Sequence, residues 1–323
     1  MIEVGYKLAT EALTPAEVVE QTVLAERAGF DFVELSDHYH PWLESQGHSG
    51  FTWTMLGAMA ARTERIGLAT GVTCPIIRYH PAIIAQAAAT TALLSDGRFT
   101  LGIGAGERLN EHVVGTGWPA VRTRHKMLRE ALEIIRLLWQ GGYQSYDGEF
   151  LQLEDARVFD LPEQLPVIAV ASGGPMASRL AAELGDGLFA TEPRSDLVEA
   201  YTGAGGSGPR YAEVPLAWAP DVESAAEAAH ETSRWALSGW KVMSELPNPV
   251  NFDAASSTVT LEDVKGQFSC GPDMDQHVAK AQGYVDAGFD HIVLQNAGPD
   301  PRGFIEAAGD GLVDRVRALA PSA

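Results

Sequence analysis

Short apolar runs that end abruptly in polar side chains recur along the 323-residue chain. The clearest is Phe32–Leu35, which is followed at once by Ser36, Asp37 and His38. A short apolar run bounded by turn-forming residues indicates a buried strand. We expect eight such strands, near residues 4–8, 32–35, 66–72, 98–103, 166–170, 187–191, 211–218 and 291–295.

Segments with helix-start and helix-stop signals separate these runs. Thr14-Pro15-Ala16-Glu17 combines an N-cap threonine, a proline at the first helical position and a capping-box glutamate, and Gly29 is the expected stop. The expected helices lie near residues 14–27, 51–63, 81–94, 122–139, 175–184, 221–238, 273–287 and 302–318.

One sequence unit repeats at both ends of the chain. Ala28–Leu35 and Ala287–Leu294 each place a glycine after a helix and an aspartate before an apolar strand, and Leu184–Phe189 is a looser echo. A recurring helix–glycine–strand unit favours one closed β/α barrel over two domains. We therefore predict a single (β/α)₈ TIM barrel over residues 1–323. Insertions are expected near 105–121, 141–165 and 239–272, and the Gly-, Pro- and Ser-rich segments 203–208 and 247–260 are expected to be loops inside insertions.

Composition narrows the possible partners. Aliphatic, aromatic and cysteine residues make up 46% of the chain, enough for a large core, and the formal charge is −20. Nucleic acid and anionic membrane surfaces need a basic partner, so neither is expected to bind. Two cysteines, Cys74 and Cys270, are too few for a disulfide framework, and no leader-like or membrane-spanning apolar stretch is visible. We expect a cytoplasmic protein that acts on a small molecule.

The residues just after the expected strands are the candidate site, because barrel enzymes draw catalytic groups from the carboxyl ends of several strands. In chain order they are Glu11; Asp37, His38, His40 and Trp42; Gly71, Val72, Cys74 and Arg78; Gly106, Glu107 and Asn110; Ser172, Gly173, Gly174 and Pro175; and Thr191, Glu192 and Arg194.

Two of these strand ends have a pattern that indicates a particular chemistry. Ser172-Gly173-Gly174-Pro175 opens a helix, and its small residues let backbone amides approach an anion, most often phosphate, although such a turn can also be a plain connection. Glu107 follows Gly104-Ala105-Gly106, where the backbone can pass close to a flat ring. A buried carboxyl group beside such a ring can donate or accept a proton, and the alternative is an ordinary helix-terminal glutamate.

The histidines raise the question of a metal. His38 and His40 have the His-x-His spacing of zinc hydrolases built on barrels. That arrangement needs further ligands from later strands, where this chain offers Ser172 and Thr191 but no histidine. We expect no metal and interpret His38, beside Asp37, as a general base.

At this point the sequence resembles a known family over nearly its full length. It is similar to the luciferase-like flavin and deazaflavin oxidoreductases, and within them to the branch of coenzyme F420-dependent glucose-6-phosphate dehydrogenase. The matching pieces are Gly5-Tyr6-Lys7 with Glu11, Ser36-Asp37-His38 with Pro41-Trp42, Arg78-Tyr79-His80-Pro81-Ala82, Gly104 to Glu111, and Gly173-Gly174-Pro175.

The resemblance implies roles for these residues. Coenzyme F420 would lie in the barrel mouth, against Asp37 and against a bulge at Gly71-Val72 that often has a cis peptide bond. His38 would take the proton of an alcohol or hemiacetal while hydride passes to C5 of the deazaflavin. Glu107 would serve the proton balance of the ring, and Trp42 and Glu11 would line the substrate side. The coenzyme contacts would be Asp37, Gly71, Val72, Cys74, Gly106, Glu107, Asn110, Ser172, Gly173, Gly174 and Thr191, and the substrate contacts His40 and Arg194.

The sequence departs from that branch where sugar phosphate is held. Arg194 can stand in for one basic residue, but residues 250–259 contain no lysine or arginine. We therefore expect glucose 6-phosphate to be a poor substrate and a neutral alcohol, sugar or unsaturated carbonyl to be closer. The alternatives are an FMN-dependent monooxygenase of the same fold and a ligand-binding member without catalysis. The resemblance also implies a homodimer.

Overall fold

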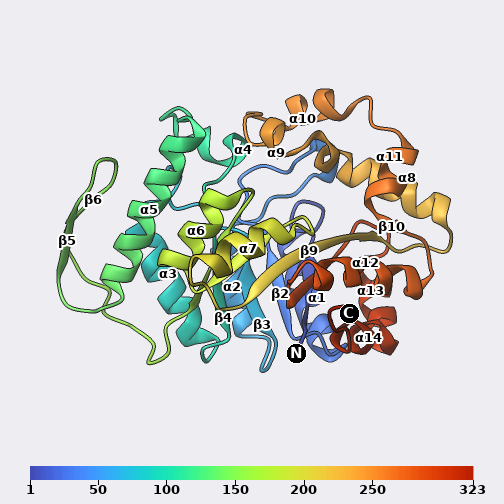
Figure 1. Cartoon of the computed structure of the whole chain (residues 1–323), viewed down its shortest axis with the longest axis horizontal. Coiled ribbons are helices and arrows are strands. Elements are labelled where there is room, and N and C mark those ends of the chain that lie inside the picture. The colour runs from blue at the N-terminus through green and yellow to red at the C-terminus, as the bar shows by residue number, and fades with distance from the viewer. Residues whose placement is uncertain (323) are drawn as a thin grey trace.

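The computed structural model describes residues 1–322, which form a closed barrel of eight parallel strands surrounded by helices (Figure 1). Around the barrel the strands follow the order β1 (Glu3–Leu8), β2 (Phe32–Leu35), β3 (Gly67–Thr70), β4 (Phe99–Ile103), β7 (Val167–Ala171), β8 (Gly187–Ala190), β9 (Arg210–Ala217) and β11 (His291–Asn296). β11 pairs with β1 and closes the sheet. The predicted (β/α)₈ barrel is confirmed, and each of the eight expected strands is present.

Helices follow the strands and cover the outside of the barrel. The covering helices are α1 (Pro15–Arg27), α2 (Thr52–Ala60), α3 (Pro81–Leu94), α5 (Val121–Leu138), α6 (Pro175–Leu184), α7 (Ser195–Gly203), α8 (Val222–Ser233), α12 (Met274–Asp286), α13 (Pro301–Ala307) and α14 (Val313–Arg317). The shorter α4 (Arg108–Glu111), α9 (Trp240–Met243), α10 (Pro249–Ser256) and α11 (Leu261–Gln267) lie in longer connections. Within residues 1–322, no helix has the length and apolar character needed to cross a bilayer.

The first helix begins as the sequence predicts. The Thr14 hydroxyl accepts a hydrogen bond from the Glu17 amide at 3.3 Å, and the Glu17 carboxylate accepts one from the Thr14 amide at 2.8 Å. This reciprocal pair satisfies two amides that the helix itself leaves free, so it fixes where α1 starts.

The repeated sequence unit has a common structural role. Gly29 and Gly288 both have positive φ, 86° and 98°, which lets the chain turn sharply from a helix into the next strand. The aspartate of each unit then accepts a hydrogen bond from the amide of the neighbouring strand: Asp31 from Val4 at 2.8 Å, Asp186 from Ile168 at 2.9 Å and Asp290 from Arg210 at 2.8 Å. These bonds fix strand register at the amino end of the barrel.

The predicted loop at 247–260 is wrong, because it contains helix α10. The Asn248 side chain accepts a hydrogen bond from the Asn251 amide at 3.2 Å, and Pro249 occupies the first turn. Asn-Pro is therefore a helix start here, although a Pro- and Ser-rich composition suggested a loop. The segment 203–208 is also not inside an insertion: Gly203 ends α7, a helix that the sequence analysis missed, and the chain turns directly into β9.

Further elements were not predicted, among them a hairpin, a short strand and a helix. An antiparallel hairpin of β5 (Gln144–Asp147) and β6 (Gln152–Ala156) projects from the side of the barrel in Figure 1. The two-residue strand β10 (Ser269–Cys270) pairs with β9, and α11 precedes it. The hairpin strands are largely polar and exposed, so no buried apolar run marks them in the sequence.

Candidate active site

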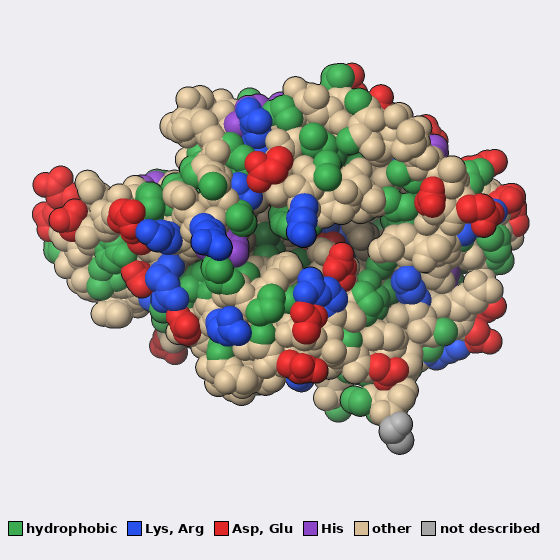
Figure 2. All heavy atoms as spheres, turned by 45° about the horizontal axis from the view of Figure 1, so that its top comes forward, with side chains coloured by type: hydrophobic (Ala, Val, Ile, Leu, Met, Phe, Trp, Pro, Cys, Tyr) green, Lys and Arg blue, Asp and Glu red, His purple; other side chains and the backbone are tan. Residues whose placement is uncertain are grey.

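The carboxyl ends of the barrel strands surround one hollow, which we call the mouth. Figure 2 turns this face toward the viewer and shows the surface hollowed near its centre, with acidic and basic side chains around it. Below the mouth, the ends of β3, β4 and β7 are in close contact. An added Cβ at Gly104, after β4, would lie 2.8 Å from Cγ2 of Val72 and 3.2 Å from Cβ of Ala171. The rim residues after β3, β4 and β7 therefore share one floor.

His38 lies between two carboxylates at this rim. Its Nδ1 is 2.6 Å from Oε1 of Glu11, which follows β1, and its Nε2 is 3.8 Å from Oε1 of Glu107, which follows β4. The Trp42 ring meets the imidazole edge to face, with centroids 4.9 Å apart. The four residues predicted to be catalytic are thus brought together.

The two sides of the His38 imidazole differ in their surroundings. Nδ1 and Oε1 of Glu11 are 2.6 Å apart, which makes an ion pair when the ring is protonated. A carboxylate so close to Nδ1 favours a proton on that nitrogen. In the neutral ring Nε2 is then the nitrogen free to accept a proton, and it faces the gap in front of Glu107.

Burial and charge act in opposite directions on this pair. Burial alone would lower the pKa of His38, but the charge of Glu11, with a smaller effect of Glu107, raises that pKa above its usual value. Burial alone would raise the pKa of Glu11, but His38, together with the charge of Lys7 and a backbone hydrogen bond, lowers this pKa to about 2. At neutral pH Glu11 is therefore ionised.

Aromatic side chains form the wall beside His38. The Trp42 ring stacks on Trp235 at a centroid distance of 4.0 Å with an interplanar angle of 11°, and it meets Phe252 of α10 edge to face at 5.1 Å. Trp42 and Phe252 are buried. The segment between β9 and β11 thus supplies apolar surface to the mouth.

Side chains from three other segments hold the backbone on both sides of His38. Arg78 donates to the carbonyl of Asp37, Ser49 donates to the carbonyl of His38 at 3.0 Å, and the Asn110 side-chain oxygen accepts from the amides of Tyr39 and His40 at 2.7 and 2.9 Å. The Asn110 side-chain nitrogen donates to Glu107. Asn110, predicted as a coenzyme contact, therefore also links the loop of His38 to Glu107.

The Asp37 carboxylate accepts hydrogen bonds from four side chains. This carboxylate, with no exposed surface, accepts bonds from Thr73 at 2.8 Å, Trp53 at 3.3 Å, Tyr79 at 3.2 Å and Arg78 at 3.0 Å. Arg78 also pairs with Glu111. Burial, partly offset by Arg78, raises the pKa of Glu111 to about 7. These contacts fix the loop after β2. A direct contact between the Asp37 side chain and the coenzyme stays a prediction.

The segment after β3 forms the floor. The Gly71–Val72 peptide bond is cis, in the position that the family resemblance implies. Gly106 has a φ of 69°, and a Cβ there would lie 2.5 Å from the sulfur of Cys74. Glycine is thus required at 106 both by its backbone conformation and by the close approach of Cys74.

The residues after β7 and β8 lie on another part of the rim. The Ser172 hydroxyl bonds to the Gly174 carbonyl at 2.9 Å, and α6 begins without a side-chain cap. Arg194 donates to the carbonyl of Gly173 at 3.1 Å and is paired with Asp196 at 2.6 Å. Thr191 is exposed beside them. Arg194, predicted as a substrate contact, therefore lies at the predicted anion-binding turn.

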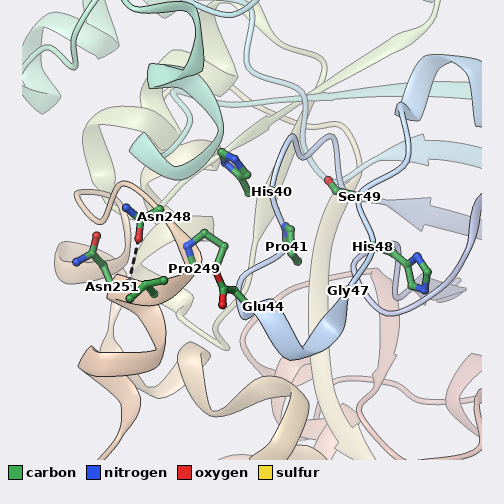
Figure 3. A pocket seen from close by; sticks show the side chains of 10 residues that line it. His40, Pro41, Glu44, Gly47, His48, Ser49, Asn248, Pro249 and Asn251 are labelled. Atoms are coloured by element: carbon green, nitrogen blue, oxygen red, sulfur yellow. Dashed lines mark hydrogen bonds between the residues drawn. The ribbon is translucent and has the colours of Figure 1, made fainter.

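His40 differs from His38 in its surroundings. Its Nδ1 contacts the Leu109 carbonyl at 3.0 Å, and the ring borders an open groove of about 710 Å³ between residues 40–49 and the start of α10. In Figure 3 Asn248, Pro249 and Asn251 lie across this groove from Pro41 and Glu44. His38 and Glu107 do not line it. Within residues 1–322, no group of three His, Cys, Asp or Glu side chains is arranged to hold a metal ion.

Sequence reasoning missed several charged residues near the mouth. Lys7, Glu34 and Glu213 are buried and in mutual contact below the floor. The sequence could have revealed these three residues, because each is a charged residue inside an apolar strand sequence. Arg78 and Glu111 lay within the matched family pieces but received no role.

Comparison with known proteins identifies the class to which this fold and this site belong. Residues 1–291 match the family described as luciferase-like monooxygenase, and the chain belongs to this family. It is 35% identical, over 98% of both chains, to an F420-dependent glucose-6-phosphate dehydrogenase of Beutenbergia cavernae, and 36% identical, over 99% of both, to that of Nocardia farcinica. Its structure is similar, with a TM-score of 0.91, 27% identity and coverage of 98% and 99%, to an F420-dependent secondary alcohol dehydrogenase in complex with an F420-acetone adduct.

The Glu11 contact predicts how His38 titrates. In a Glu11→Gln variant, burial is no longer opposed by the nearest charge, so the pKa of His38 should fall from above to below about 6.5. NMR titration of the imidazole signals measures it. Glu107→Gln is the matched control and should lower the pKa less, because Glu107 lies 3.8 Å away. An unchanged His38 pKa in Glu11→Gln would contradict this assignment.

Proposed function

We propose that this protein is an F420-dependent oxidoreductase that transfers a hydride between an alcohol or hemiacetal carbon and C5 of the deazaflavin. The observation that carries the proposal is His38 at the barrel mouth, with Glu11 on one ring nitrogen and Glu107 facing the other. The family membership and the names of the similar proteins support the same chemistry.

The residues at the mouth fit this coenzyme. An added Cβ at Gly174 would meet no atom within 4 Å, and at Gly173 only Trp240 at 3.6 Å, so the turn offers open backbone at the uncapped start of α6. A phosphate of the coenzyme tail would lie at this helix start, where it would compete with the Ser172 hydroxyl for the Gly174 amide, 3.4 Å away. Val72, Cys74 and Gly106 would support the ring from below, with Asp37, Glu107, Asn110 and Thr191 as further predicted contacts. When bound, F420 supplies a two-electron acceptor for the hydride of the alcohol carbon.

His38 would move the proton of the substrate hydroxyl. In alcohol oxidation Nε2 accepts this proton as the carbon–hydrogen bond breaks and the carbonyl forms, and Glu11 stabilises the resulting imidazolium. In carbonyl reduction the protonated ring returns the proton. Because the pKa of His38 is raised, oxidation should become faster as pH rises through a value above about 6.5, where the ring becomes neutral.

Glu107 and Trp42 would act beside His38. Glu107, whose side chain is about one-eighth exposed, would serve the proton balance of the coenzyme ring. Trp42 would exclude water from the side of the reacting carbon, because its ring is fixed by Trp235 and Phe252. A dry site strengthens the electrostatic contacts within it.

Coenzyme binding and one substitution test the proposal. The protein should bind F420 in a fluorescence titration, and His38→Asn should lower kcat by about 10²–10⁴-fold while the Kd for F420 stays within about threefold. His48→Asn, outside the mouth, is the control. Tight FMN binding without F420 binding would favour the monooxygenase alternative. Full activity of His38→Asn would remove the proposed base.

We propose a small neutral alcohol or its ketone as the substrate, in preference to a sugar phosphate. Phe252 of α10 approaches Trp42, but residues 250–259 provide no cation. Arg194 is neutralised by Asp196 and bound to Gly173. Neither of these two places therefore supplies the free charged donor that usually holds a phosphate in proteins.

Substrate comparison tests this preference. The kcat/KM for the best neutral alcohol, with isopropanol and glucose included, should exceed that for glucose 6-phosphate by at least about tenfold, because each missing charged hydrogen bond weakens phosphate binding by roughly that factor. Bleaching of the deazaflavin absorption reports the rate. Glucose 6-phosphate as the best substrate would show that other cations reach the phosphate.

We also propose a homodimer that covers α3. Ile83, Ala87, Thr90 and Leu94 follow one helical face, and Ile83 and Leu94 are more than half exposed, at 55% and 58%. Phe51, at the start of α2, is exposed to a similar degree. Apolar residues at this spacing suit packing against a helix of a second copy.

Sedimentation measurements test the dimer. The wild-type protein should sediment as a dimer, and Ile83→Glu/Leu94→Glu should sediment as a folded monomer, because two buried charges oppose the contact. Val222→Glu changes an exposed apolar residue on α8 and should remain dimeric. A monomeric wild type would exclude the proposed dimer.

A further inference from the structure

Three buried charged residues lie inside the barrel directly below the mouth. Lys7 is on β1, Glu34 on β2 and Glu213 on β9, with exposures of 6%, 0% and 8%. β11 separates β1 from β9 in the sheet, so the contact between Lys7 and Glu213 crosses the barrel interior. We call these three residues the charged layer.

Lys7 uses all three of its N–H groups in this layer. Its Nζ is 2.7 Å from Oε1 of Glu34, 2.7 Å from Oε1 of Glu213 and 2.8 Å from the carbonyl oxygen of Gly71. Two partners are carboxylates, and the third is backbone at the mouth floor. A buried ammonium with three acceptors is fixed in place, and so are the groups that accept from it.

The contact with Gly71 connects the layer to the floor. A Cβ at residue 71 would lie 2.0 Å from Oε1 of Glu34, so the carboxylate approaches the backbone as closely as glycine allows. Val72 follows directly, and added Cβ atoms at Gly102 and Gly104 would lie 3.2 and 2.8 Å from its methyl groups. Lys7 thus holds the chain at the point where Val72 covers the barrel interior.

The layer has one cation and two carboxylates. With both ionised, a net negative charge would be buried at the barrel centre, and Glu34 Oε2 has no hydrogen-bond partner. Burial, together with the charge of Glu213 and against that of Lys7, raises the pKa of Glu34 to about 8. The carboxylate pair therefore holds one proton at pH 7, which leaves the layer neutral.

Few other titratable groups face Glu34. Lys7 faces it from β1, and Glu213 and Tyr211 face it from β9; the segment after β3 presents only the Gly71 backbone. Glu11 and His38 are near enough to Lys7 for its charge to affect them. The charge of the layer therefore acts on the mouth.

We propose that Lys7 is a positioning residue for the coenzyme: it fixes the Gly71 carbonyl and Val72 as the support for the ring, within a layer kept neutral by one shared proton. This inference rests on the proposed function. Above pH 8 the layer loses its proton and places a negative charge below an anionic coenzyme, so affinity should fall.

A variant without the layer tests the positioning role. Lys7→Met/Glu34→Met/Glu213→Met removes every charge and nearly conserves volume, which often preserves folding where a single removal would not. Circular dichroism and a cooperative thermal transition should be retained, while the Kd for F420 rises at least about tenfold because Gly71 and Val72 are no longer fixed. Wild-type affinity in this folded variant would overturn the inference.

Glu34→Gln provides a second test that does not depend on the triple variant folding. It keeps Lys7, one carboxylate and the donation to Gly71, so at pH 7 the Kd for F420 should stay within about threefold of wild type. Between pH 7 and 9 the wild-type affinity should fall several-fold, and that of Glu34→Gln should fall less. Parallel pH profiles would overturn the role of the shared proton. Absence of F420 binding to the wild type would instead refute the proposed function.

Discussion

Closure of the parallel sheet is the constraint on which the site depends. β11 pairs with β1 through Val4 and Ile292, so the eight strands form one ring with all carboxyl ends on the same side. Glu11, His38 and Glu107 follow β1, β2 and β4 of this ring, so all three lie at the same end of the barrel and within contact distance. The aspartates of the repeated unit fix the opposite end of the same strands. Register at the amino end of the barrel thus helps to determine how these three side chains are placed at its carboxyl end.

The position of His38 is determined by polar contacts more than by apolar packing. Arg78 and Ser49 hold the carbonyls of residues 37 and 38, and Asn110 holds the two amides that follow. Arg78 is itself fixed by Asp37 and Glu111. Each of these partners is buried or nearly so, where an unsatisfied polar group is costly. The network therefore resists displacement of the imidazole, and the proposed proton transfer depends on a fixed imidazole position.

Much of this fold could be predicted from sequence, because apolar runs and helix caps are local signals. Thr14 and Pro15 mark α1, and the Gly-Phe-Asp units mark helix-to-strand turns. α10 was missed because Asn248-Pro249 was interpreted by composition, although the same dipeptide is a cap followed by a first-turn proline. The hairpin after α5 has no apolar run, so local pattern could not reveal it.

The site residues were predicted as a set, but their partners were not. The contacts of His38 with Glu11, and of Asn110 with the amides after His38, join segments that are distant in sequence. Arg194 and Asp196 are close in sequence, so their ion pair is local. The position of Arg194 beside Gly173 depends instead on the pairing of β7 with β8. A charged residue within a strand, such as Glu34, can be recognised from sequence as unusual. Its contact with Lys7 and Glu213 in one charged layer becomes visible only in the closed barrel.

The ionisable residues of the mouth and most of its aromatic wall come from different parts of the fold. Glu11, His38 and Glu107 follow directly from barrel strands, so the fold itself fixes them. The aromatic wall instead combines Trp42 with Trp235 and Phe252, which come from the long connection between β9 and β11. Such connections can change sequence without disturbing the strands. A change there, such as the presence or absence of basic residues in α10, can therefore alter the wall of the mouth without moving Glu11, His38 or Glu107 at the rim.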